Sequence, residues 1–339
     1  MNRFVQRLVC MRLVIVATLL ALMSMTLAQP QSFIITTAST GGTFYPVGVG
    51  MASLWTEQLR EQGVRVSAIS SAGSAENIAM LRFEEVELGI VGAYFGRIAY
   101  DAVEEYEGAP EFTELRSLVS LWPNVEQWIL RAEFAETGTI DDLVGRQVNI
   151  GRPGSGTELY AMHTLRGLGI EDQVEFEYVG FFEAVDLMRD RRIDGANLGG
   201  GPPIGAITEA YTTMGPDQVV MLEFTDEQLQ SVIDHSPMPM YRYVLPADTY
   251  PGQTEEKELM AQVTFLAIHG NMDDDIVYDM TRTIFENQEY LVGIHSIMEL
   301  IQLDTALDGL PVPLHAGAYD YYVEAGLDIP SELIPPERQ

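Results

Sequence analysis

Residues 33–46 read FIITTASTGGTFYP and decide the fold class, because they join an apolar run to two glycines flanked by hydroxyl side chains. Residues 33–37 predict a β-strand, and residues 46–61 predict a helix with apolar side chains on one face. That face carries Val47, Met51, Leu54 and Leu59. A strand, a glycine turn and a helix form the first part of a β-α-β unit, which indicates an α/β protein.

The rest of the chain alternates in the same way. Further strands are predicted at 64–69, 88–91, 115–121, 127–131, 147–151, 174–179, 193–198 and 263–268, and further helices at 158–168, 182–190, 204–212, 226–234 and 276–289. Trp122-Pro123-Asn124 predicts a break between two strands, where we expect the chain to cross into a second lobe. The expected division is lobe I at 29–124 and 236–339 and lobe II at 125–235, each a mostly parallel sheet flanked by helices.

The N-terminus has the pattern of a secretory signal peptide. Arg3, Arg7 and Arg12 precede the apolar run 13–23, and residues 26–28 supply small side chains for cleavage. The run is shorter than the roughly 20 residues that a spanning helix needs. We therefore expect residues 1–28 to be removed and the mature protein to be periplasmic. Because Cys10 is the only cysteine, the mature chain would lack a thiol, a disulfide and cysteine metal ligands.

The charge balance excludes several classes of partner. The 339 residues include 50 acidic and 19 basic side chains, for a net charge of −31. A surface of this sign repels nucleic acids and anionic membrane surfaces, so neither is expected as a partner.

Three glycine-rich turns follow predicted strands, at residues 39–43, 70–74 and 153–157. Glycine lets a ligand approach the backbone, and the first N–H groups of a helix have no intrahelical partner, so such a turn can bind an anion. Any one of them is also ordinary turn and cap chemistry. Because two turns belong to the first lobe and one to the second, the sequence predicts an anion site in the cleft between the lobes.

The sequence contains no motif for phosphate binding, for a serine nucleophile or for a metal site. The phosphate motifs GxxxxGK[ST] and GxGxxG are absent, and Ser155 does not lie in a GxSxG elbow. The histidines have no metal-ligand spacing, and residues 271–275 are interpreted as the N-terminal cap of a helix. We therefore expect no cofactor, no metal and no enzyme activity. The histidines are His163, His235, His269, His295 and His315.

The segments ITTASTGGTFYPVGVGMASLW, SSAGSAENIAML and NIGRPGSGTELYA resemble the TAXI family of extracytoplasmic solute receptors, and similarity extends from about residue 33 to 327. The resemblance implies a two-lobed periplasmic binding protein, type II-like, that closes on a ligand in the cleft. It also implies a TRAP-type membrane permease as partner. The ligands that it implies are small organic anions, either dicarboxylates or acidic amino acids such as glutamate or 2-oxoglutarate. We expect a monomer.

The resemblance also implies a set of ligand-binding residues. The first motif supplies Thr40, Gly41, Gly42, Thr43 and Tyr45, the second Ser74 and Asn77, and the third Gly154, Ser155, Gly156 and Thr157; Gln127 and Gly200 match polar and small positions at the cleft. Arg152 stands where similar proteins have a small residue. Its guanidinium either points inward to pair with a ligand carboxylate or points outward to nearby acidic residues.

Two other functions use the same fold. A ligand-sensing subunit of a signalling system would need the same binding chemistry, and neighbouring genes would separate it from a transport receptor. A periplasmic enzyme is the weaker alternative, because the mature chain offers neither a cysteine nor a recognised nucleophile and base pair.

Overall fold

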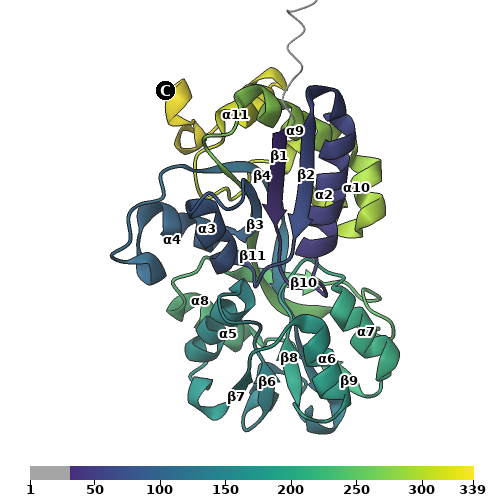
Figure 1. The fold of residues 1–339 in the computed structure, drawn as a ribbon. Coiled ribbons are helices and arrows are strands. Elements are labelled where there is room, and N and C mark those ends of the chain that lie inside the picture. The colour runs from purple at the N-terminus through teal and green to yellow at the C-terminus, as the bar shows by residue number, and fades with distance from the viewer. Residues whose placement is uncertain (1–30) are drawn as a thin grey trace, which may run out of the picture.

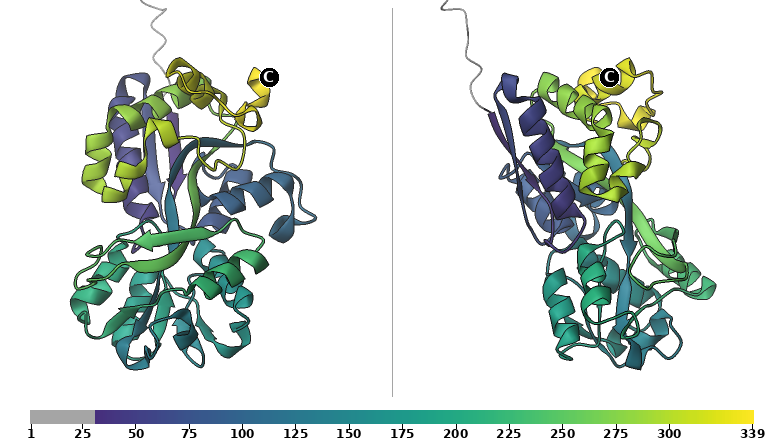
Figure 2. Two further views of the ribbon diagram at one scale, coloured as in Figure 1. Left: turned by 180° about the vertical axis from the view of Figure 1, so that it is seen from behind. Right: turned by 90° about the vertical axis from the view of Figure 1, so that its right-hand side faces the viewer.

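A computed structural model describes residues 31–339 of the chain, so the predicted signal peptide lies outside the described residues. The protein is α/β and has two lobes, each built on one sheet with helices on its faces (Figures 1 and 2). No helix in residues 31–339 is both long enough and apolar enough to cross a membrane.

The first lobe, at the top of Figure 1, is built on the strand order β10-β11-β3-β1-β2, with β4 also paired to β11. Its strands are β1 (Gln31–Thr36), β2 (Val64–Ile69), β3 (Leu88–Gly92), β4 (Leu115–Glu126), β10 (Tyr241–Leu245) and β11 (Lys257–His269). Its helices are α2 (Phe44–Gln58), α3 (Ser74–Arg82), α4 (Ala93–Asp101), α9 (Asp274–Glu286), α10 (Gln288–Ile294) and α11 (Ala316–Glu324).

The second lobe has the strand order β7-β6-β8-β5-β9. Its strands are β5 (Trp128–Arg131), β6 (Gln147–Asn149), β7 (Glu175–Glu177), β8 (Gly195–Asn197) and β9 (Val219–Met221), and its helices are α5 (Gly156–Gly167), α6 (Phe181–Arg189), α7 (Gly205–Thr213) and α8 (Asp226–His235).

Both sheets are mixed. β1, β2 and β3 are parallel, as are β6, β7 and β8, because helices connect successive strands in these segments. β11 is antiparallel to β3, β4 and β10, and β5 is antiparallel to β8 and β9. The expectation of mostly parallel sheets therefore holds only for the β-α-β segments.

The expected break at residues 122–124 is wrong. β4 runs without interruption through Pro123 to Glu126. Proline is tolerated here because β4 forms a ladder with β11 alone, and the register shifts opposite Pro123, between Val263 and Phe265. The chain leaves the first sheet only at Gln127, and β5 begins at Trp128 in the second.

Apolar side chains form one core in each lobe and a third cluster that both lobes share. In the first lobe the predicted face of α2 is buried, which confirms the periodicity of that helix. The shared cluster joins α4 to α5, where the rings of Phe95 and Tyr160 lie edge to face with centroids 5.7 Å apart. The two lobes are therefore packed against each other.

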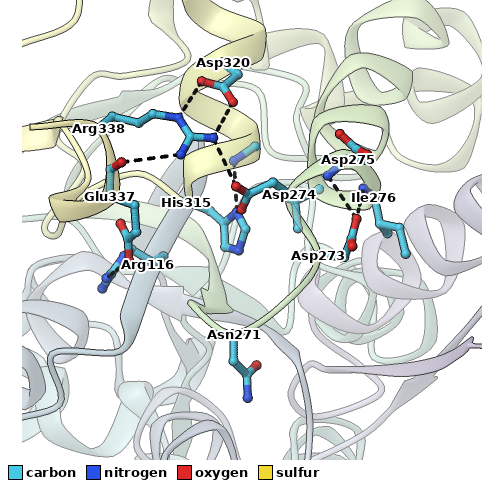
Figure 3. Close-up of polar contacts among 12 residues, drawn as sticks. Arg116, Asn271, Asp273, Asp274, Asp275, Ile276, His315, Asp320, Glu337 and Arg338 are labelled. Atoms are coloured by element: carbon cyan, nitrogen blue, oxygen red, sulfur yellow. Dashed lines mark hydrogen bonds and ion pairs between the residues drawn. The ribbon is translucent and has the colours of Figure 1, made fainter.

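The C-terminal end of the chain is held on the first lobe by charged groups (Figure 3). Arg338 donates hydrogen bonds to Asp320 at 2.6 Å and to Asp274 at 3.0 Å, and Arg116 donates to Glu337 at 2.8 Å. Beside them, the Asp273 carboxylate accepts from the first amides of α9 at 3.0 and 3.2 Å, so the predicted helix cap is confirmed.

Candidate functional site

The three glycine-rich turns meet around one cavity between the lobes. Its walls include both turns of the first lobe and the turn of the second lobe. The lining residues are Ala38, Ser39, Gly42, Thr43, Phe44, Ala72, Gly73, Ser74, Asn124, Ser155, Gly156, Thr157, Phe181 and Gly199. The lining is dominated by small side chains and hydroxyl groups.

Three helices begin at this cavity. α2 starts after Thr43, α3 after Gly73 and α5 after Ser155. The Ser155 hydroxyl accepts from the Glu158 amide at 3.0 Å and so caps α5. Because the first amides of a helix have no intrahelical acceptor and carry the positive end of the helix dipole, the cavity wall is suited to a negatively charged group.

Hydrogen bonds join the lobes across the cavity. The Thr43 hydroxyl donates to the carbonyl oxygen of Gly201, and the Ala206 amide donates to the Gly41 carbonyl at 3.0 Å. On the other side, the Glu76 amide donates to the Gly154 carbonyl at 3.3 Å. The space open to the centre of a water-sized sphere is about 20 Å³, little more than one water needs. The lobes are therefore closed around this cavity, and an organic ligand does not fit in the space as it stands.

Six residues predicted from the sequence line this cavity: Gly42, Thr43, Ser74, Ser155, Gly156 and Thr157. Others lie close by without lining it. Thr40 and Gly154 are exposed, Tyr45 is half-buried, and Gly41 contributes its carbonyl to the contact between lobes. Gly200 bonds to β4 through its backbone, and its neighbour Gly199 lines the cavity instead.

Asn77 is expected from the sequence to contact a ligand, but its side chain is fully used inside the protein. Its amide donates to the carbonyls of Thr37 and Ile90 at 2.6 and 2.8 Å. Its side-chain oxygen accepts from the hydroxyls of Thr36 and Ser71 at 2.8 and 2.6 Å. Since an amide has two donors and two acceptor positions, Asn77 has none left, and its role is to fix the turns after β1 and β2.

Gln127 is also occupied. It is fully buried between the lobes, where its amide donates to the Gly200 carbonyl at 3.2 Å and its oxygen accepts from the Tyr250 hydroxyl. Tyr250 in turn accepts from the Ile204 amide at 2.9 Å. Gln127 thus ties β4, the turn after β8 and the segment before α7 together, and it does not line the cavity.

Arg152 is exposed and lies outside the cavity lining. Its guanidinium rests over Gly180, where a Cβ in place of the glycine hydrogen would lie 3.0 Å from Nη2. The inward alternative is therefore not the arrangement in the closed lobes.

Sequence reasoning misses Asn124, which reaches the cavity from β4. Because the sequence predicts a break at residues 122–124, it does not assign Asn124 and Glu126 to a strand. In the structure both lie on one face of β4, since side chains alternate along a strand.

A buried carboxyl group lies beneath the cavity floor. Glu126 is 1% exposed, and its Oε2 accepts from the Asn197 amide at 2.6 Å. Burial raises the pKa of Glu126 to about 8, although the hydrogen bond from Asn197 acts to lower it. Nearby, burial raises the pKa of Tyr160 well above its ordinary value. Glu126 therefore holds its proton at neutral pH in the closed protein.

A family model described as the NMT1-like family matches residues 35–326. The chain belongs to the NMT1-like family. Among solved structures, this NMT1-like protein is similar to the periplasmic aliphatic sulphonate binding protein SsuA from Escherichia coli, with 14% identity over 90% of this chain and 88% of that chain and a TM-score of 0.49.

Two further solved structures show a likeness of the same order. The alkanesulfonate-binding protein SsuA from Xanthomonas axonopodis pv. citri, bound to MOPS, is 12% identical over 88% of this chain and 92% of that chain, with a TM-score of 0.46. A putative L-cystine ABC transporter from Listeria monocytogenes is 10% identical over 81% of this chain and 98% of that chain, with a TM-score of 0.47. At this level of likeness, none of them informs on the ligand of this NMT1-like protein.

Proposed function

We propose that this protein is a periplasmic solute receptor that captures a small organic anion in the cleft and delivers it to a TRAP-type membrane transporter. The proposed ligand is a dicarboxylate or an acidic amino acid, such as 2-oxoglutarate or glutamate. The observation that carries the proposal is the convergence of three helix N-termini, each preceded by a glycine-rich turn, on one cavity between the two lobes.

The proposed contacts are the hydroxyl groups of Ser74, Ser155 and Thr157 and the first backbone amides of α2, α3 and α5. Donors of this kind stabilise a carboxylate at short range. They must do so against the net charge of −31, which repels an anionic ligand at long range. A ligand that touches turns from both lobes binds the closed form better than the open form and so shifts the protein towards closure.

We also propose the membrane partner of the protein, its location and the boundaries of its lobes. The TRAP-type permease is inferred from the resemblance of the glycine-turn segments to the TAXI family, and the periplasmic location from the signal-peptide pattern of residues 1–28. We propose that residues 127–235, which follow the end of β4, move as lobe II against the remainder, as a monomer.

The test is ligand binding by the mature chain, unfolded and refolded to remove any bound molecule. Thermal shift would be measured with glutamate, aspartate, 2-oxoglutarate, succinate, malate and neutral amino acids. We expect a rise in melting temperature with at least one carboxylate, because binding to the folded state alone stabilises it. No shift with any carboxylate would contradict the proposal.

A matched pair of variants on α5 separates binding from folding. Thr157→Val removes a hydroxyl that lines the cavity, and Thr164→Val removes a fully buried hydroxyl on the same helix, away from the cavity. The proposal expects the ligand-induced shift to fall in Thr157→Val and to persist in Thr164→Val. Equal ligand-induced shifts in the two variants would show that the glycine-rich turn before α5 does not bind the ligand.

A further inference from the structure

One turn of the second lobe lies directly on the first lobe. Residues 199–203 read GGGPP and lie between β8 and α7; we call them the GGGPP turn. A Cβ placed on Gly201 would lie 2.5 Å from Cδ1 of Trp122 on β4 and 2.9 Å from Cγ1 of Ile297, in the 3-10 helix η6 (Ser296–Leu300). Glycine therefore lets the backbone of the turn rest on first-lobe side chains. The same turn forms part of the cavity wall.

His295 holds the end of the GGGPP turn from the opposite lobe. Its ring lies between α10 and η6, and its Nε2 is 3.1 Å from the Pro203 carbonyl oxygen. Its Nδ1 is 3.2 Å from the Ile297 amide nitrogen, which can only donate. Nδ1 is therefore the acceptor, and Nε2 carries the proton that it donates to Pro203. One neutral tautomer satisfies both contacts.

A second proton on this ring is disfavoured while the lobes are closed. It would reside on Nδ1 and point at the Ile297 amide, so that two donors would face each other. The bond to Pro203 keeps the ring in this orientation, and its half-buried position limits the hydration of a charge. Burial accordingly lowers the pKa of His295, although the bond to Pro203 acts to raise it. Once the turn has moved away, the ring can rotate into water.

No charge on a neighbouring element offsets this effect. The GGGPP turn itself has no titratable side chain, and those on the surrounding elements do not shift the pKa of His295. They are Tyr45 of α2, Glu209 of α7, Tyr243 of β10, Glu289 of α10 and Glu299 of η6.

Two groups elsewhere between the lobes also titrate. Burial lowers the pKa of His163 on α5, although Glu105 acts to raise it, and burial raises the pKa of Glu126 on β4. If opening hydrates these groups, acid favours the open form at His163 and the closed form at Glu126. The contribution of His295 is therefore measured against variants in which both of these groups are retained.

We propose that His295 is a pH-sensitive latch, which holds the GGGPP turn and the closed cleft while its ring is neutral and releases them when it is protonated. The inference rests on the lobe motion of the proposed function and adds a regulation of the cleft, whatever the ligand is. The contribution of His295 to the opening equilibrium constant should rise as the pH falls below about 6.5, the ordinary pKa of histidine. Because one proton is taken up, the rise is at most about tenfold per pH unit.

Two substitutions separate the contacts of the ring. His295→Gln is long enough to donate to Pro203 and does not titrate. His295→Asn is too short to reach Pro203, but its oxygen can accept from the Ile297 amide, as asparagine does at helix caps. Small-angle X-ray scattering of the ligand-free mature chain between pH 7.5 and 5.5, on either side of the ordinary pKa of histidine, measures opening as a larger radius of gyration. Circular dichroism at each pH separates opening from unfolding.

We expect the radius of the wild type to rise relative to that of His295→Gln as the pH falls. His295→Asn should have a larger radius than the wild type at pH 7.5, and the difference should shrink towards pH 5.5 as the wild type opens. The same pH dependence in wild type and His295→Gln would overturn the inference. So would a His295→Asn protein as compact as the wild type at pH 7.5, which keeps the test available if His295→Gln does not fold.

The latch and the proposed ligand class can fail separately. The scattering experiment contains no ligand, so a negative result leaves capture of an organic anion untouched. A thermal-shift panel in which no carboxylate binds would contradict the proposed function and leave the bond between His295 and Pro203 to be tested by scattering alone.

Discussion

The side-chain hydroxyl of Thr43, at the start of α2, donates a hydrogen bond to the backbone carbonyl of Gly201 in the opposite lobe. Together with the bond from the Ala206 amide to the Gly41 carbonyl, it fastens the first glycine-rich turn to the second lobe. The closed arrangement is therefore stabilised by the protein's own groups.

Replacing Thr43 with valine should favour the open form. Thr43→Val preserves the shape and removes one buried neutral hydrogen bond, so the closed form should lose about 1 kcal/mol relative to the open form. Small-angle X-ray scattering on the ligand-free protein should then give a larger radius of gyration. Thr212→Val, which removes an exposed hydroxyl bonded only within α7, is the control. An unchanged radius would show that this bond does not hold the lobes together.

A methyl group at Gly92 should prevent full closure. Its Cβ would clash with the Tyr160 hydroxyl oxygen across the interface between lobes, whereas the next ring atom, Cζ, is 3.4 Å away. Gly92→Ala should therefore open the lobes and weaken ligand binding. Adding Tyr160→Phe removes the clashing oxygen and should restore both properties. Additive losses in the double variant would contradict this explanation, because clashing neighbours must couple.

The buried histidines should lower the stability as the pH drops below about 6.5, the ordinary value for histidine, whereas the raised pKa of Glu126 acts in the opposite direction. Burial lowers the pKa of His315, although Asp274 acts to raise it, and burial also lowers the pKa of His163 and His295. The unfolded chain therefore takes up protons first, so acid favours unfolding.

His315 can be tested separately because asparagine can replace its structural role. Its Nδ1 accepts from the Gly317 amide at 3.1 Å and caps α11, and asparagine is a good cap that does not titrate. His315→Asn should reduce the slope of unfolding free energy against pH between 7.5 and 5.5, by at most about 1.4 kcal/mol per pH unit. Equal slopes in wild type and His315→Asn would assign the pH dependence to other groups.

The two arginines at the C-terminal contact should differ in their effect on stability (Figure 3). The Arg116 side chain is 4% exposed and donates to Glu337 and to backbone carbonyls, so Arg116→Met should cost about 1 to 3 kcal/mol by leaving the carbonyls of Thr113 and Leu115 unpaired. The Arg338 side chain is 30% exposed, and Arg338→Met should cost less than about 1 kcal/mol. Urea denaturation measures both. Similar losses would mean that burial does not determine the strength of these contacts.

The sequence alone predicts the β-α-β segments well, because strand and helix periodicity and turn chemistry are local signals. The strand at 64–69 matches β2, and the predicted cap at Asp273 is observed. Local signals fail for β10, which lies in a proline-spaced stretch, and for the first half of β11, which pairs antiparallel with β10 up to Ala261 and with β4 from Met260 onward. These strands form through pairings between distant segments, which no short window contains.

The site shows the same limit. The hydroxyl and glycine residues at the turns can be predicted from the sequence, because a turn is determined by residues that are neighbours in the chain. Asn77 looks like a turn residue able to bind a ligand, yet its four hydrogen-bonding positions are taken by three other segments of the first lobe. The position of Asn124 beside the cavity follows from the continuation of β4 through Pro123, which local signals do not indicate.

The passage of β4 from one sheet towards the other has a consequence for engineering. The strand that places Asn124 in the cavity wall also bonds through Val125 to Gly200 of the second lobe. In the proposed receptor, ligand selectivity and lobe motion would therefore both depend on this segment. A designer who converts this scaffold into a fluorescent biosensor cannot retune the recognised molecule at β4 without also changing the amplitude of the signal. Changes in specificity are better introduced at the turns, where side chains can vary without altering the strand that connects the two sheets.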